Sequence, residues 1–411
     1  MAYYQFAFQR GIIMSGKTLG SLSCLFALMT ALLLGCDSGD DSAIEKPTTS
    51  HTQVGEAQLS EAERQRISAA SLKAWKAADP VLTAAVDNAQ QLHVAVNNLL
   101  KAPTAEALSA ARHHWRETAL TYQPFNLYGS LAELQPEQFH QLRQLIYAIA
   151  ARPIQPGYLD NFGPYTYSGL VHDIGITISP ETLREQHGMT DAQDAALGLY
   201  AVQFMLFGYS DAEPRQVADF VTQELTAEQR QQGFNNEEEL PENRRRQLVR
   251  TEAQLLVDDL QRLQQLWQLN TDGSLAEIFT AYSPLQQHSL WVRAARLELS
   301  EIITELGKHH TASTTKTTAG APAKTVDLDI GDTSFANRVP IAFLAARTQQ
   351  LYGLAQTLQM STELQENLKR GHQLLNQLKS QNAATGASES VITALTQALD
   401  LMVAAQDGDI K

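Results

Sequence analysis

The chain has 411 residues, a formal net charge of −14 and only two cysteines. This acidic balance argues against nucleic acid and anionic membrane surfaces as partners, because both repel a negatively charged protein. With Cys24 and Cys36 as its only thiols, the chain has to rely on a hydrophobic core rather than a disulfide framework, and its length is sufficient for two core-bearing units.

The N-terminal residues predict a lipoprotein export signal. Lys17 precedes an apolar stretch, residues 19–34, that is too short to span a bilayer comfortably. The stretch closes with Leu33-Leu34-Gly35-Cys36, the pattern of a lipobox, in which cleavage leaves the cysteine as the lipid-bearing first residue. We therefore predict a signal peptide over residues 1–35 and lipidation of Cys36. The mature protein is then anchored in the cell envelope and faces the periplasm, with inner or outer membrane left open.

The remaining sequence is predicted to be helical. Residues 36–57 are rich in Asp, Ser and Thr and predict a flexible tether. Ser60 and Glu63 then form a capping box, and apolar residues recur at helical spacing. Because alternating strand patterns with turn signals are missing, the predicted class is all-α, with two packed antiparallel bundles over residues 58–270 and 271–411. The predicted helices cover residues 59–78, 84–100, 104–122, 137–151, 190–207, 244–269, 285–306, 341–358, 363–380 and 391–405.

Two polar segments interrupt this pattern. Residues 309–324 are of low complexity and predict a mobile loop within the second bundle. Residues 231–246 contain Glu237-Glu238-Glu239 followed by Arg244-Arg245-Arg246. A charge run of this kind predicts a solvated loop and helix start.

The most apolar predicted helix, residues 190–207, carries a polar pair. Thr190 and Gln193 predict a capping box at its start. Tyr200 and Gln203 project from one helical face; they either satisfy each other or the backbone within the core, or line an inter-helix cleft and bind a small polar ligand. Gly198 costs about 1 kcal/mol relative to Ala in a helix interior, which predicts close approach of another helix.

Residues 191–210, DAQDAALGLYAVQFMLFGYS, and the long predicted helix at 244–267 resemble the imelysin-like family of bacterial envelope proteins. That family includes insulin-cleaving membrane proteases, iron-regulated lipoproteins and the periplasmic component of a ferrous-iron uptake system. Its hallmark is G-x-H-x-x-E, in which His and Glu can reach one cation. In this chain the frame reads Gly198-Leu199-Tyr200-Ala201-Val202-Gln203. A neutral phenol and a carboxamide, both weak ligands, therefore stand at the two metal-binding positions.

The resemblance extends upstream to Trp115 and Tyr122, and these two residues are candidates to line a cleft. Where family members often carry a Glu about one turn after the tyrosine, this chain has Pro124-Phe125-Asn126, so Asn126 is the third candidate cleft residue. We therefore predict that the family metal site is lost or remodelled. Iron or zinc would be the cation of such a site, and the sequence assigns no cofactor.

A relocated metal site is the alternative. His113 and His114 lie four and three residues before Glu117, so one helical turn could present all three to a cation. In that case the protein is a metal-dependent peptidase with moved ligands.

Together these patterns predict a non-catalytic binding or accessory protein of the periplasm, linked by resemblance to iron acquisition. Its expected partners are the membrane, through the lipid anchor, and envelope or iron-uptake proteins. Besides the peptidase, a scaffold that holds partner proteins on its helical surface is the other alternative.

Overall fold

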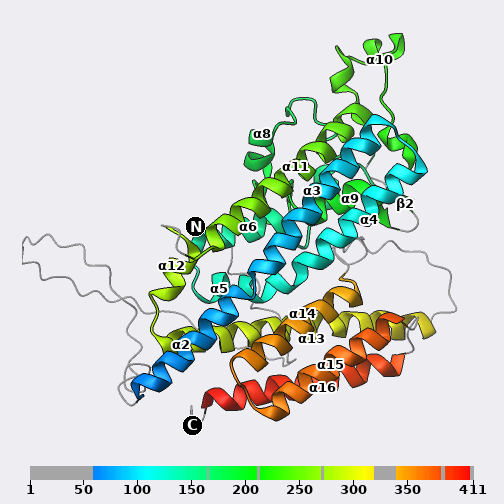
Figure 1. Cartoon of the computed structure of the whole chain (residues 1–411). Coiled ribbons are helices and arrows are strands. Elements are labelled where there is room, and N and C mark those ends of the chain that lie inside the picture. The colour runs from blue at the N-terminus through cyan, green and yellow to red at the C-terminus, as the bar shows by residue number, and fades with distance from the viewer. Residues whose placement is uncertain are drawn as a thin grey trace, which may run out of the picture. The chain divides into compact units, whose positions relative to one another are not determined.

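The computed structural model describes residues 59–163, 166–210, 213–269, 273–318, 339–380 and 385–407, most of which are helical (Figure 1). Within these ranges the only strands are the short antiparallel pair β1 (Gly208–Ser210) and β2 (Glu213–Pro214). The predicted all-α class is therefore confirmed. The predicted signal peptide, Cys36 and the tether lie outside the described residues. Among the helices that are described, none is both long and apolar enough to cross a membrane.

The helices of the N-terminal part pack around α3. This helix lies beside α4 and α11, and the short helix α9 contacts α4, α6 and α11 (Figure 1). Apolar side chains at helical spacing form the faces that meet, since every third or fourth residue of α3 is buried. The elements are α2 (Glu61–Lys76), α3 (Asp79–Lys101), α4 (Ala105–Tyr122), η1 (Gln123–Phe125), α5 (Asn126–Leu134), α6 (His140–Ala150), α7 (Pro156–Leu159), α8 (Pro180–Gln186), α9 (Leu199–Phe207), η2 (Val217–Phe220), α10 (Ala227–Gln231), η3 (Glu237–Glu239) and α11 (Pro241–Trp267).

The C-terminal part follows α11. Helix α13 packs against α14 and α16, and α15 contacts both α14 and α16. Helix α13 also packs against α2 and α5, and residues 55–411 form one compact unit. The predicted boundary near residue 270 falls between α11 and α12, and a division into two bundles there stays a prediction. The elements are α12 (Leu275–Thr280), α13 (Pro284–Thr318), α14 (Ile341–Thr357), α15 (Thr362–Ser380) and α16 (Thr385–Asp407).

Helix α13 is longer than predicted. It continues to Thr318, so the prediction of a mobile loop is wrong for residues 309–318. The low-complexity sequence HHTASTTKTT contains neither Gly nor Pro, and it can therefore extend a helix that is already nucleated. The rest of the predicted loop, residues 319–324, lies outside the described residues.

Three tryptophans form the centre of the core. Trp75 of α2 stacks on Trp267 at the end of α11. The ring of Trp291 from α13 lies 6.3 Å from that of Trp75, centroid to centroid, and its indole N–H donates to the carbonyl of Ser71 at 3.1 Å. All three indoles are fully buried. The core therefore runs without interruption from α2 and α11 into α13.

Helix starts follow the expected capping chemistry. The backbone N–H of Ser60 donates to the Glu63 carboxylate at 2.8 Å, and the N–H of Glu63 donates to the Ser60 hydroxyl, which confirms the capping box at α2. Ser179 and Ser274 accept in the same way from the first turns of α8 and α12.

Candidate functional site

The motif segment is a short buried helix that begins later than predicted. Helix α9 starts at Leu199, so the predicted start at Thr190 is wrong. The hydroxyl of Thr190 donates to the carboxylate of Asp194, which also accepts the N–H of Asp191 at 3.0 Å. The Asp194 carboxylate thus binds two donors within residues 190–194, and this segment forms turns rather than the first turn of a helix. The predicted capping box between Thr190 and Gln193 is absent from this described segment.

Gly198 connects this turn to α9. It precedes the helix with φ of 94°, a left-handed conformation that favours glycine. A Cβ added there would lie 2.6 Å from the carbonyl oxygens of both Ala148 and Ile149 at the end of α6. The predicted close approach of another helix is confirmed, but Gly198 lies before the helix rather than inside it.

Tyr200 and Gln203 lie one turn apart inside the core. They are only 6% and 7% exposed, respectively. The indole N–H of Trp115 from α4 donates to the carbonyl of Leu199 at 2.7 Å and so fixes the start of α9 against α4. Among the described residues the side-chain oxygen of Gln203 has no hydrogen-bond donor. The prediction that Tyr200 and Gln203 form hydrogen bonds with each other or with the backbone is therefore wrong for this oxygen.

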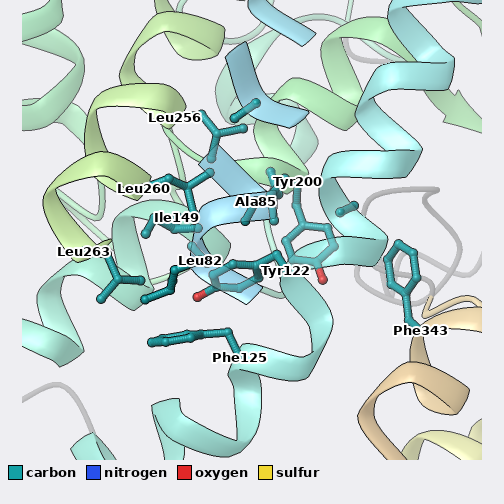
Figure 2. Close-up of a cluster of buried hydrophobic side chains, with 14 of the residues drawn as sticks. Leu82, Ala85, Tyr122, Phe125, Ile149, Tyr200, Leu256, Leu260, Leu263 and Phe343 are labelled. Atoms are coloured by element: carbon teal, nitrogen blue, oxygen red, sulfur yellow. The ribbon is translucent and has the colours of Figure 1, made fainter. Parts of the chain in front are cut away.

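Tyr122 lies in the same cluster as Tyr200. Figure 2 shows the two rings projecting from α4 and α9 among buried apolar side chains. Burial, together with the neighbouring Tyr200, raises the pKa of Tyr122. Its hydroxyl has no hydrogen-bond partner in the described part of the chain. The structure therefore brings Tyr122 and Trp115 to the motif. The surrounding side chains that Figure 2 labels are Leu82, Ala85, Phe125, Ile149, Leu256, Leu260, Leu263 and Phe343.

Asn126 has a different environment. It begins α5 and donates from its side-chain amide to Gln123 at 3.2 Å, within its own turn. This is a local contact, and its assignment to the cleft stays a prediction.

An arginine just after α6 connects the motif to α13. The guanidinium of Arg152 lies over the ring of Tyr200, 5.6 Å from its centroid. The same group forms ion pairs with Glu305 at 3.3 Å and Glu301 at 4.0 Å, both on α13. Glu301 also pairs with Arg347 of α14 at 2.9 Å. These ion pairs connect the segment after α6 to α13, and α13 to α14, and Arg152 holds this network against the ring of Tyr200.

The candidate replacement ligands do not gather into a site. His113 and His114 are adjacent on α4, with ring centroids 5.4 Å apart, and Glu117 is exposed. In the described ranges no group of three or more His, Cys, Asp or Glu side chains is placed to hold a metal ion. The candidate replacement ligands on this turn therefore do not form a site for the cation that the resemblance implied, and the two motif positions offer only a neutral phenol and a carboxamide.

A second polar centre, missed in the sequence, surrounds Asp160. Its carboxylate is fully buried and lies 2.5 Å from donor nitrogens of both Arg215 and Arg245, with His172 Nε2 at 3.4 Å. Burial alone would raise the pKa of Asp160, but the charges of Arg215 and Arg245 and the nearby His172 ring hold it well below its usual range. The carboxylate therefore stays ionised and joins three distant segments.

The arginine run at the start of α11 belongs to this centre. Arg244 is only 5% exposed and donates to carbonyls of the loop before α8, at 2.6 Å for Leu170 and 2.9 Å for Val171. Arg246 donates to the carbonyls of Leu100 and Phe220. The prediction of a solvated run is therefore wrong for the three arginines, because Arg245 pairs with the buried carboxylate of Asp160 and the other two donate to backbone carbonyls.

Glu252 is a buried acid two turns after Arg245 on α11. It is fully buried, and in the described structure neither carboxyl oxygen has a hydrogen-bond partner. Burial, reinforced by the negative charge of Asp160, raises the pKa of Glu252 well above its usual value. The only sequence signal for it is a glutamate on the otherwise apolar face that contains Val249 and Leu256.

Comparisons with family models and solved structures show which family the chain belongs to. Residues 78–324 match the family model named Imelysin, peptidase M75. A crystal structure of a protein from Parabacteroides distasonis, named as an iron-regulated protein A precursor, is similar at a TM-score of 0.49 and 15% sequence identity. That match covers 82% of this chain and 95% of the other. No curated protein matches the chain. Since the family model covers well over half of the sequence, the chain belongs to the imelysin family.

Proposed function

We propose that this protein is a non-catalytic imelysin that serves as a binding or accessory component of the cell envelope in iron acquisition. The observation that carries the proposal is the state of the motif: Tyr200 and Gln203 stand at the ligand positions, and both are buried. Trp115 fixes the start of α9, and Arg152 covers the Tyr200 ring. A phenol and a carboxamide are weak cation ligands, so these side chains support packing, with the unpartnered Gln203 oxygen open to a small polar donor, rather than cation binding.

The peptidase alternative has less support. A catalytic metal site needs about three protein ligands, an open position for water and a general base. His113, His114 and Glu117 do not meet the first of these requirements in the structure. In the described structure Glu252, the acid whose carboxyl oxygens have no hydrogen-bond partner, is fully buried.

The iron link rests on family membership, since imelysin-like proteins include iron-regulated lipoproteins.

The envelope location rests on Leu33-Leu34-Gly35-Cys36. Radiolabelled palmitate should be incorporated into wild type and not into Cys36→Ser. Equal labelling of both would refute the anchor.

The accessory role can be tested in the source bacterium. A deletion strain should grow more slowly than wild type when iron is chelated and equally well when iron is replete. Complementation with the wild-type chain should restore growth, and so should His114→Ala, because that histidine has no role in the proposal. Normal growth of the deletion strain under iron limitation would overturn the iron link. Restoration that fails only with His114→Ala would favour the peptidase.

A direct assay separates the two functions in vitro. The purified protein, supplied with zinc or ferrous iron, should leave unfolded peptide substrates intact. Cleavage that needs the metal and disappears in His114→Ala would refute the non-catalytic assignment.

A further inference from the structure

A cavity of about 670 Å³ lies away from the motif, between α2, the start of α13, the turn joining α14 to α15, and α16. Its volume is in the range of about 300–1,000 Å³ found for small-molecule sites. None of the residues around Tyr200 or Asp160 lines it.

The inner wall of the cavity is apolar. Leu285, Leu358, Leu364 and Met402 contribute to it from four different elements, and all four are buried. Such a wall favours a hydrocarbon chain, because each methylene group placed there leaves water.

The rim of the cavity is cationic. Arg66 and Lys73 are two turns apart on α2, and both line the cavity with exposed side chains. No Asp or Glu lines it, and within the described part of the chain neither cation forms an ion pair. Glu63, one turn before Arg66 on α2, interacts electrostatically with Arg66 but does not line the cavity, so the charged groups that line it are both cations. The rim therefore favours an anionic head group.

Uncharged polar groups complete the rim. Gln359, in the turn after α14, has a φ of 55°, a conformation that favours glycine, and it lines the cavity together with Ser361. Ser289 and the half-buried His288 line the cavity from α13. These groups can donate hydrogen bonds to a carboxylate beside the two cations.

We propose that this cavity binds a single-chain amphiphile with a carboxylate head, that is, a long-chain fatty acid. The acyl chain lies on the wall formed by Leu285, Leu358 and Met402, and the carboxylate lies at Arg66 and Lys73. This is a binding activity distinct from the proposed accessory role and independent of the motif at Tyr200.

The test is a displacement titration with the full chain carrying Cys36→Ser, kept free of alkyl detergent. A dansyl-labelled fatty acid is the probe, and palmitate and the uncharged alcohol of equal chain length are the competitors. Palmitate should displace the probe at one site per chain, and the alcohol should compete more weakly. Arg66→Gln/Lys73→Gln should weaken palmitate about tenfold, because two partly solvated charge contacts are lost.

Two further variants make the result decisive. Lys76→Gln, on α2 but outside the cavity, should bind palmitate like wild type. Ile67→Trp, which fills the cavity from α2, should abolish binding while the thermal midpoint confirms that the chain is folded. Equal competition by acid and alcohol, or an unchanged affinity in the double variant, would overturn the carboxylate assignment. Absence of binding to the full chain would overturn the site, and binding that appears only after removal of residues 408–411 would assign the cavity to the chain's own C-terminus.

Discussion

Trp75 and Trp267 are bound to each other reciprocally. Their rings stack 3.8 Å apart, centroid to centroid, with planes only 4° from parallel. The indole N–H of Trp75 donates to the carbonyl of Trp267 at 3.0 Å, and that of Trp267 donates to the carbonyl of Trp75 at 3.2 Å. Since α2 and α11 are far apart in the chain, this pair holds the first helix of the N-terminal part against the end of its last long helix.

The tryptophan pair should be strongly coupled. Trp75→Phe removes one of the two hydrogen bonds and part of the stack, and leaves the buried carbonyl of Trp267 without its donor. We expect a loss of about 2–4 kcal/mol in the free energy of unfolding, measured with urea. Trp115→Phe, which loses a hydrogen bond but no stacked indole, should cost less. In a double-mutant cycle the two positions of the pair should couple by at least about 1 kcal/mol; additive effects would contradict the reciprocal arrangement.

Gly198→Ala should destabilise the protein by about 3 kcal/mol, because the new methyl group would meet the carbonyls that end α6 and the backbone would have to keep a positive φ. Gly353→Ala is the control, since a Cβ at that helical position meets nothing within 4 Å. The control should be neutral or stabilise α14 by about 0.5–1 kcal/mol. Equal effects in thermal unfolding would contradict the close approach at Gly198.

Asp160→Asn should cost about 3–5 kcal/mol, because it leaves two buried guanidinium groups without their counter-charge. Glu61→Gln, which breaks a solvent-exposed pair with Arg64, should cost about 0.5 kcal/mol or less. Circular dichroism at increasing urea concentrations measures both. A small effect at Asp160 would mean that the arginines find other acceptors.

Glu252 should make stability fall as the pH rises. Its pKa is raised in the folded state, so above the ordinary glutamate value the unfolded chain releases a proton that the folded chain keeps. This contribution is fully present below about pH 4.5 and is lost progressively as the pH rises toward the folded-state pKa. Glu252→Gln removes the ionisation, so its stability relative to wild type should increase from pH 5 to pH 8. A difference that does not change with pH would show that Glu252 is not the titrating group.

The long helices could be predicted from local sequence alone. Apolar spacing indicates α3, α4 and α11, and Ser60 and Ser274 mark helix starts, because capping involves residues three apart. Family membership could likewise be inferred from residues 191–210, although both ligand positions of the motif are substituted.

The polar centre around Asp160 could not be predicted in this way. Arg245 and its carboxylate partner are 85 residues apart, and the carbonyls that accept from Arg244 belong to a loop without periodicity. A charge run has the same local appearance whether it is solvated or buried. The late start of α9 could not be predicted for a similar reason, because the positive φ of Gly198 before the helix accompanies its packing against carbonyls of α6, which are distant in the sequence.

Calorimetric titration of iron and zinc into the metal-free full chain can decide whether packing has replaced the family cation site. Tyr200→His/Gln203→Glu, which restores both family ligands, and Tyr200→Phe/Gln203→Leu are the companion variants. We expect no stoichiometric binding to wild type or to the apolar variant, and a gain only in the restored variant. Tight one-to-one binding by wild type that is lost in Tyr200→Phe/Gln203→Leu would show that the cation site is retained.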